Sequence, residues 1–178
     1  MRLPRAIRLD PSDAFIFDPA AEPGEWVVPG AFRFWGADPA GLSGKPRQAF
    51  RSGFLGLSSF GWSTLATVSE ATSAEREAAV TLLSQQLVRH MGAPSEAEAR
   101  PAAEGEIAVA ASLCDHPVGT ILAVERTLED GEIRERFRTL HRRAGARLDP
   151  ARAFAFVPVE EEEPVEDFDI RTLGRTGS

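Results

Sequence analysis

Residues 123–143 read AVERTLEDGEIRERFRTLHRR, and this stretch carries the clearest structural signal in the sequence. Its centre, Asp130-Gly131, is a dipeptide typical of two-residue β-hairpin turns. A turn at this place sets the register of both strands, because each residue before the turn then faces one particular residue after it. The register gives two pairs of opposite charge and two apolar pairs: Arg126 with Glu135, Glu125 with Arg136, Val124 with Phe137 and Leu128 with Ile133. Cross-strand pairs of both kinds stabilise a sheet, so we expect a hairpin here.

The same register divides the side chains between two faces, because successive side chains of a strand alternate. Arg134, Arg136 and Arg138, here called the arginine stripe, fall on one face with Glu125 and Thr127, and the apolar side chains fall on the other. The stripe has two interpretations. It either binds an anionic ligand or an acidic partner protein, or it is the solvent-exposed face of a half-buried sheet whose arginine stems cover apolar backbone.

Charge along the chain allows a third interpretation of the stripe. Residues 132–152 form a short basic block, and the run Glu160–Glu163 that follows is acidic. This run therefore also qualifies as an internal partner that lies near the arginine stripe. Salt would then loosen such a contact, because mobile ions screen exposed charges.

Length and composition indicate a single globular domain. The chain has 178 residues, of which 43% are hydrophobic and 26% are charged, and these are ordinary values for one packed core. We expect one α+β domain over residues 1–160 and an acidic, flexible C-terminal tail over residues 161–178. The net charge of −7 argues against nucleic-acid binding, which depends on neutralising phosphates with Lys and Arg.

Cysteine content and hydropathy predict a location in the cytoplasm. The one cysteine, Cys114, cannot form an intramolecular disulfide, which removes the class of disulfide-stapled secreted domains. The first residues lack the apolar segment of a signal peptide, and no later run reaches the 18 apolar residues that indicate a membrane span. We therefore expect no membrane partner.

Extended segments dominate the first third of the sequence. Alternating or continuous apolar residues predict strands over residues 13–18, on both sides of Pro29-Gly30, and over residues 58–71. The run 153–159 predicts a last strand after the hairpin. Pro and Gly between these segments are typical of turns.

Two capping patterns predict the central helices. Thr72 and Glu75 have the spacing of a capping box, and Gly92 supplies a stop after an apolar repeat. A second box begins at Ser95, and we expect Pro101 to break or restart that helix. A short helix is also expected from Pro46. The sum is an α+β fold, with an antiparallel sheet of about five to seven strands and two central helices packed on one face.

Ten of the fourteen Phe and Trp residues lie between Phe15 and Trp62. Such a cluster either lines a pocket for a flat apolar ligand or forms the core of the sheet. Trp26, Trp35 and Trp62 are the candidate binding residues, because each indole N–H needs a hydrogen-bond partner when it is buried.

Cys114, Asp115 and His116 place a thiol, a carboxylate and an imidazole next to one another. They are candidates for a nucleophile with its base, or for metal ligands. A tetrahedral metal site needs three or four ligands, however, and the only other histidines are His90 and His141. The glycines of residues 51–63 also lack a Walker or dinucleotide-binding pattern. We therefore expect no metal, assign no catalytic residue outside this trio, and leave the cofactor unknown.

Four stretches carry a resemblance to a known family: RAIRLDPSDAFIF, AAEPGEWVVPGAFRFW, RSGFLGLSSFGWSTLATV and ASLCDHPVGTILAVERTLEDGEIRE. They resemble an uncharacterised bacterial family, a domain of unknown function, over roughly residues 1–140. The family has no assigned activity, so the resemblance transfers no functional residue and implies at most an accessory role.

The sequence favours a non-catalytic cytoplasmic binding or accessory protein, whose basic strand face receives an anionic ligand or an acidic partner. The alternative is a small enzyme with a site at the aromatic-rich end of the sheet, near Cys114-Asp115-His116. A purely structural subunit is the third possibility, and it would present an exposed apolar patch.

Overall fold

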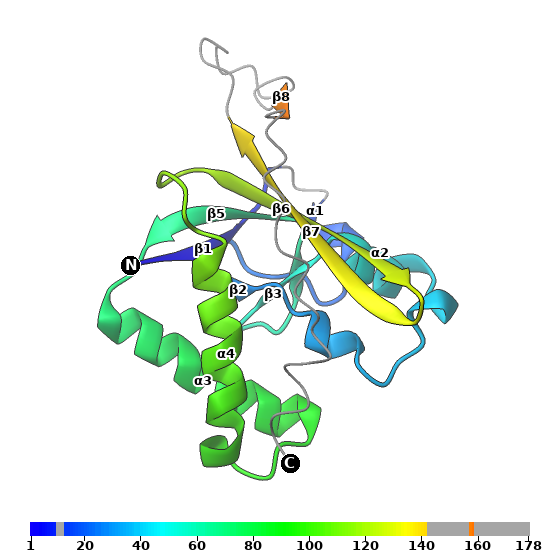
Figure 1. The fold of residues 1–178 in the computed structure, drawn as a ribbon, viewed down its shortest axis with the longest axis horizontal. Coiled ribbons are helices and arrows are strands. Elements are labelled where there is room, and N and C mark those ends of the chain that lie inside the picture. The colour runs from blue at the N-terminus through cyan, green and yellow to red at the C-terminus, as the bar shows by residue number, and fades with distance from the viewer. Residues whose placement is uncertain (10–12, 142–156, 159–178) are drawn as a thin grey trace.

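The computed structural model describes residues 1–9, 13–141 and 157–158, and it confirms the expected α+β fold (Figure 1). Within these ranges the strands form two antiparallel sheets rather than one. The larger sheet has the order β1 (Arg2–Ile7), β5 (Leu65–Glu70), β6 (Ile121–Glu129), β7 (Glu132–His141) and β8 (Val157–Pro158). The smaller sheet has the order β2 (Val27–Val28), β3 (Phe54–Gly56) and β4 (Trp62–Ser63). The two sheets meet where Arg5 of β1 bridges Trp26 just before β2.

The β6–β7 hairpin has the predicted register. Its pairs run from Ile121 opposite Leu140 to Glu129 opposite Glu132, and they include every pair expected from the turn. Asp130 and Gly131 form the turn with φ values of 51° and 78°. Positive φ at both central residues is the geometry that matches the twist of the flanking strands, which explains why this dipeptide sets the register.

The helices also begin at the predicted caps. The Thr72 hydroxyl accepts a hydrogen bond from the Glu75 N–H, the Glu75 carboxylate accepts one from the Thr72 N–H, and α3 (Ser73–Met91) follows. Gly92 ends α3 with a φ of 74°. The expected break at Pro101 is wrong: α4 (Glu96–Ser112) continues through this residue. Pro101 removes one helical hydrogen bond near the start of α4, where it is exposed to solvent and the cost is small.

The helices and sheets share two clusters of buried apolar residues. α3 and α4 pack against each other, and α4 also contacts β1 and β2 (Figure 1). α2 (Gly44–Ser52) begins slightly before the helix start expected at Pro46 and packs against β6 of the hairpin. The larger cluster joins α3 and α4 to Leu55, Phe32 and Trp62, and the smaller one lies beneath β5 and β6.

Three expected strands are wrong or incomplete. Residues 13–16 form the short helix α1 (Asp13–Ile16), and Ala31–Phe34 form the 3₁₀ helix η1, which a second one, η2 (Pro39–Gly41), follows. Residues 58–71 divide into β4 and β5, which belong to different sheets. Glycines just before η1 and β4 make close contacts with residues distant in the sequence. A Cβ at Gly30 would lie 2.5 Å from the Leu55 Cβ, and one at Gly61 would lie 2.6 Å from the Ala20 backbone.

The C-terminal region is described only at β8, which pairs antiparallel with the last two residues of β7. The rest of the expected strand over residues 153–159, the acidic run 160–163 and the tail expected over residues 161–178 lie outside the described residues.

Candidate functional site

The arginine stripe lies on the outer face of the hairpin, as the register requires. Arg136 and Arg138 are exposed, and Arg134 is half-buried. The Arg138 guanidinium donates a hydrogen bond to the Glu125 carboxylate at 3.1 Å, and Arg134 forms an ion pair with Glu129 at 2.8 Å. The stripe is therefore partly neutralised by carboxylates of the same face, and both pairs are open to water.

Within residues 1–9, 13–141 and 157–158, one edge of β7 has a paired strand only at its end. β6 pairs with one side of β7 over its whole length. On the other side, the described part of the chain supplies only β8, which pairs with Leu140 and His141. An unpaired strand edge presents N–H and C=O groups to which another extended segment can add.

The inner face of the same hairpin carries a buried arginine. Arg126 is 1% exposed, and its Nε donates a hydrogen bond to the Glu135 carboxylate at 2.9 Å. Its two terminal nitrogens donate to main-chain carbonyl groups of the segment before η1 and of the end of α2: Pro29, Ala49, Phe50 and Gly53. These carbonyls at the C-terminal end of α2 carry partial negative charge, which favours a cation there. We call this arrangement the Arg126 cage.

A second carboxylate approaches the Arg126 cage from α4. Burial raises the pKa of Glu106 to about 7; repulsion by Glu135 acts in the same direction, and Arg126 opposes it. Burial also raises the pKa of Glu135, although the adjacent Arg126 opposes the change. A half-buried carboxyl group that titrates near neutrality can exchange protons, but structural ion networks show the same property.

Sequence reasoning found half of the Arg126 cage. The register predicted the pair of Arg126 with Glu135, and strand alternation places both on the same face as Val124 and Phe137, which was the available signal for their burial. Glu106 was missed. It belongs to a different element, and its position opposite the hairpin follows from tertiary packing alone.

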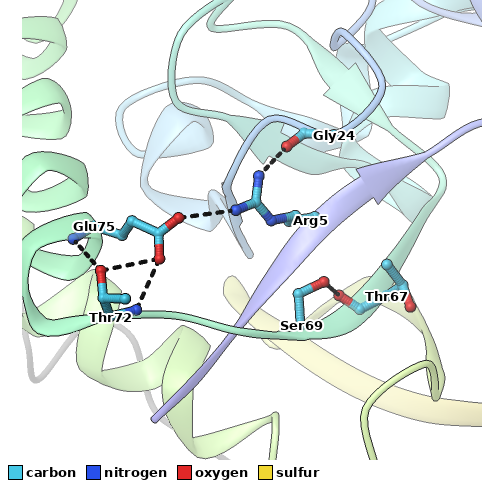
Figure 2. A network of polar contacts seen from close by, with 6 residues as sticks. All are labelled: Arg5, Gly24, Thr67, Ser69, Thr72 and Glu75. Carbon is cyan, nitrogen blue, oxygen red and sulfur yellow. Dashed lines mark hydrogen bonds and ion pairs between the residues drawn. The ribbon is translucent and has the colours of Figure 1, made fainter.

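Trp26 lies beneath an arginine that is held by other contacts. The Arg5 guanidinium lies 3.5 Å from the centre of the Trp26 ring. Figure 2 shows the same guanidinium donating to the Gly24 carbonyl at 2.8 Å and to the Glu75 carboxylate at 3.4 Å. Hydrogen bonds from Thr72 lower the pKa of Glu75, which keeps this carboxylate charged. Trp26 thus helps to join β1 to the start of α3.

The other two tryptophans differ in exposure. Trp62 is 7% exposed and stacks on Phe34, with 5.2 Å between the ring centres. Trp35 is 41% exposed and contacts the Phe32 ring edge-on, with centres 6.4 Å apart. The structure therefore places Trp62 in the core and Trp35 at the surface.

Cys114, Asp115 and His116 follow the end of α4 but lie in different environments. Cys114 is 2% exposed in the smaller apolar cluster, and burial raises the pKa of its thiol to about 12. Asp115 is exposed and His116 is half-buried; the His116 carbonyl accepts a hydrogen bond from Arg2 at 2.8 Å. A thiol that stays protonated at neutral pH is a poor nucleophile and a poor metal ligand. The alternative of a small enzyme remains a prediction, with Cys114 as its weakest member.

A hollow of about 330 Å³ lies beside the Arg5 network. It is lined by Met1, Arg2, Glu70, Ala71, Thr72 and Glu75. Arg2 joins it to the main chain of His116, but neither Trp35 nor Trp62 contributes to its wall. Within residues 1–9 and 13–141, no three His, Cys, Asp or Glu side chains are grouped as metal ligands. Among the described helices, none has both the length and the hydropathy to cross a bilayer.

These features define a small α+β protein with a buried arginine cage and an exposed arginine stripe on one hairpin. The model of the family described as a family of unknown function (DUF6505) matches residues 1–153, so the chain belongs to this family. Comparisons with curated proteins and with solved structures give no match. The family assignment confirms the resemblance found in the sequence and brings no activity with it.

Proposed function

We propose that this protein is a non-catalytic accessory protein of the bacterial cytoplasm, and that it binds an acidic partner protein through the arginine stripe. The exposed position of Arg136 and Arg138, aligned on one face of β7, is the observation that carries the proposal. Guanidinium groups bind carboxylates through two parallel hydrogen bonds, which suits arginine to the recognition of acidic surfaces.

The edge of β7 that the described residues leave largely unpaired supports strand addition as the mode of binding. In this mode an extended segment pairs with a sheet edge through its main chain, and its alternate side chains contact one face. β8 already pairs with one end of this edge, at Leu140 and His141. A partner segment with Glu or Asp at alternate positions would bring its carboxylates to the face of the arginine stripe.

The carboxylates beside the stripe do not prevent such binding. Glu125 and Glu129 pair with Arg138 and Arg134, but the side chains of both pairs are between 37% and 61% exposed. Exposed ion pairs contribute about 0–1 kcal/mol, so exchanging one carboxylate for another costs little. Charged residues also protect an edge strand from aggregation, and this is the competing explanation for the stripe.

The test is fluorescence anisotropy of a labelled peptide of alternating Glu and Val, titrated with the full chain. The triple variant Arg134→Gln, Arg136→Gln, Arg138→Gln is compared with a matched control, in which exposed Lys45, Arg47 and Arg51 of α2 become Gln. Both variants change the net charge equally. We expect the wild type and the control to bind, and the stripe variant to bind about tenfold or more weakly.

Two results would overturn the proposal. Equal loss of binding in both triple variants would show that net charge alone attracts the peptide. Absence of binding to the wild type would leave the arginines as protection of the edge strand. A circular dichroism spectrum identical to that of the wild type shows that the stripe variant is folded.

A further inference from the structure

A second surface with unusual side-chain contacts lies where η1 meets the last turn of α3. We call it the Arg33 face, and it consists of Arg33, Trp35, Phe60, His90 and Met91. The Arg33 guanidinium lies 4.6 Å from the centre of the Phe60 ring, and the His90 ring stacks on the same phenyl ring with centres 4.8 Å apart. Trp35 of the adjoining segment is the exposed tryptophan.

Arg33 differs from Arg126 in the groups that surround its positive charge. Among the residues that the structure describes, no Asp or Glu lies within ion-pair distance of its guanidinium. Its terminal nitrogen donates to the Met91 Sδ at 3.3 Å, and sulfur is a weak acceptor. Its Nε is buried and has no hydrogen-bond partner in the described part of the chain. Arg126, by contrast, is surrounded by a carboxylate and four carbonyl groups.

Phe60, whose ring lies beneath Arg33, has a strained backbone conformation. Phe60 has a φ of 55°, which is sterically unfavourable for a bulky side chain. The turn before it is fastened at two points: the Glu25 carboxylate accepts from the Ser58 and Ser59 N–H groups at 2.9 and 3.1 Å, and the Gln86 amide donates to the Leu57 carbonyl at 2.9 Å. Strain of this kind persists where the surrounding contacts enforce it, and it is concentrated at functional sites.

We propose that the Arg33 face is a second docking surface, and that it binds an acidic peptide segment of a partner protein. A carboxylate of the segment pairs with the Arg33 guanidinium, and an adjacent apolar side chain packs against Trp35. Charge complementarity selects this occupant, because a partly buried guanidinium whose described acceptor is a weak sulfur gains most from an anion. Trp and Arg are also the residues that most often dominate binding energy at protein interfaces.

The chain offers a direct probe, because it contains three tryptophans in different environments. Full-length protein labelled with 5-fluorotryptophan is observed by ¹⁹F NMR, and the resonances are assigned with Trp→Phe variants. The ligand is a peptide of alternating Glu and Leu; the same peptide with Gln in place of Glu, and inorganic phosphate, are the controls. We expect the Glu peptide to shift the Trp35 resonance and to leave the Trp62 resonance in place.

Variants separate charge from packing on the Arg33 face. Arg33→Gln should lower the affinity for the Glu peptide about tenfold or more, as followed at the Trp35 resonance. Arg33→Lys should recover only part of this affinity, because lysine lacks the guanidinium fork. Trp35→Ala is observed instead by anisotropy of the labelled Glu peptide. Measured in a background in which Arg134, Arg136 and Arg138 are Gln, this variant should also reduce the affinity for the peptide.

Several results would overturn the proposal. The first is a Trp35 resonance that does not shift when the Glu peptide is added. The second is an equal shift of this resonance with the Gln peptide. The third is a Trp35 resonance that shifts to saturation with phosphate and not with the Glu peptide. Because the readout is local to Trp35, neutralising the arginine stripe should leave it unchanged. The anisotropy test of the stripe is made in an Arg33→Gln background, so that this proposal and the function proposed for the stripe can fail separately.

Discussion

Arg126 and Arg136 belong to the two strands of one hairpin, and each is paired across the ladder with a glutamate. Arg126 is 1% exposed, and its guanidinium meets Glu135 and the carbonyl groups at the end of α2. Arg136 is exposed beside Glu125 on the opposite face. The same residue types therefore form a buried structural cluster on one face and an accessible charged surface on the other.

The difference shows that the alternation of side chains along a strand decides whether a charged side chain faces the core or the solvent. The groups packed around a buried charge then decide whether its burial is stable. A buried cation is stable only where acceptors surround it. The C-terminal end of α2 supplies three of those acceptors, the carbonyls of Ala49, Phe50 and Gly53, because the last carbonyls of a helix lack the full set of helical partners. The arginine stripe needs no such arrangement, since water solvates it.

Removing the buried arginine should have the largest effect on stability. Arg126→Leu leaves Glu135 as an uncompensated buried charge and removes the guanidinium donor from four carbonyl groups, of which Ala49 keeps the Gly53 N–H. We expect a loss of about 3–5 kcal/mol in the free energy of unfolding, measured by urea denaturation. The matched variant Arg136→Leu, on the other face of the same hairpin, should change it by about 0.5 kcal/mol or less.

A double variant tests the reason for that loss. Adding Glu135→Leu to Arg126→Leu removes the stranded carboxylate, so part of the lost stability should return. If the double variant has a lower free energy of unfolding than Arg126→Leu alone, the burial of an unpaired Glu135 charge is the wrong explanation.

Glu106 should make stability depend on pH. Its pKa is about 7 in the folded protein against a usual value of 4.5, so the folded state holds the extra proton between these values. The contribution of Glu106 to the free energy of unfolding therefore falls as pH rises from 4.5 to about 7. Glu106→Gln should be more stable than the wild type at pH values above 7, by up to about 3 kcal/mol, and the difference should vanish below the usual value.

Glu104→Gln is the control for this pH dependence. Glu104 lies on the same helix, is exposed and pairs with Arg100 at 3.0 Å. Its substitution should cost about 0.3–0.5 kcal/mol when both charges are present, as for other pairs of this spacing. Thermal unfolding across the pH range compares the two variants. A stability difference between Glu106→Gln and the wild type that does not change with pH would contradict the burial of Glu106 beside Glu135.

Neutralising the whole arginine stripe should have only a small effect on stability. Replacing Arg134, Arg136 and Arg138 by Gln removes two exposed ion pairs, and we expect a loss of about 1 kcal/mol or less. Urea denaturation at low and high salt should show that most of this loss disappears with salt, because the pairs are screened. A large loss that salt does not change would place the stripe in the core rather than at a docking surface.

Local signals explain which parts of the fold were predictable. Asp130-Gly131 sets a register by turn geometry, and the Thr72–Glu75 box sets the start of α3; both act within a few residues. The η1 helix and β4 follow glycines that contact residues distant in the sequence, such as Gly61 against Ala20. A single sequence carries no comparable signal for such contacts.

The candidate surfaces follow the same rule. The face of the arginine stripe was predictable because strand alternation is local. The approach of Glu106 to Glu135 was not, since α4 and β7 meet only in the folded protein. The Arg33 face combines η1, the Phe60 turn and the end of α3, so its members are far apart in the sequence.

Thiol accessibility along β7 tests the division of the hairpin into two faces most directly. Single cysteines are placed in turn at Glu135, Arg136, Phe137 and Arg138 in a Cys114→Ser background, and the rate of labelling by a maleimide is measured. The division into two faces predicts fast labelling at 136 and 138 and slow labelling at 135 and 137. Equal rates at all four positions, or fast labelling at 135 and 137, would contradict it.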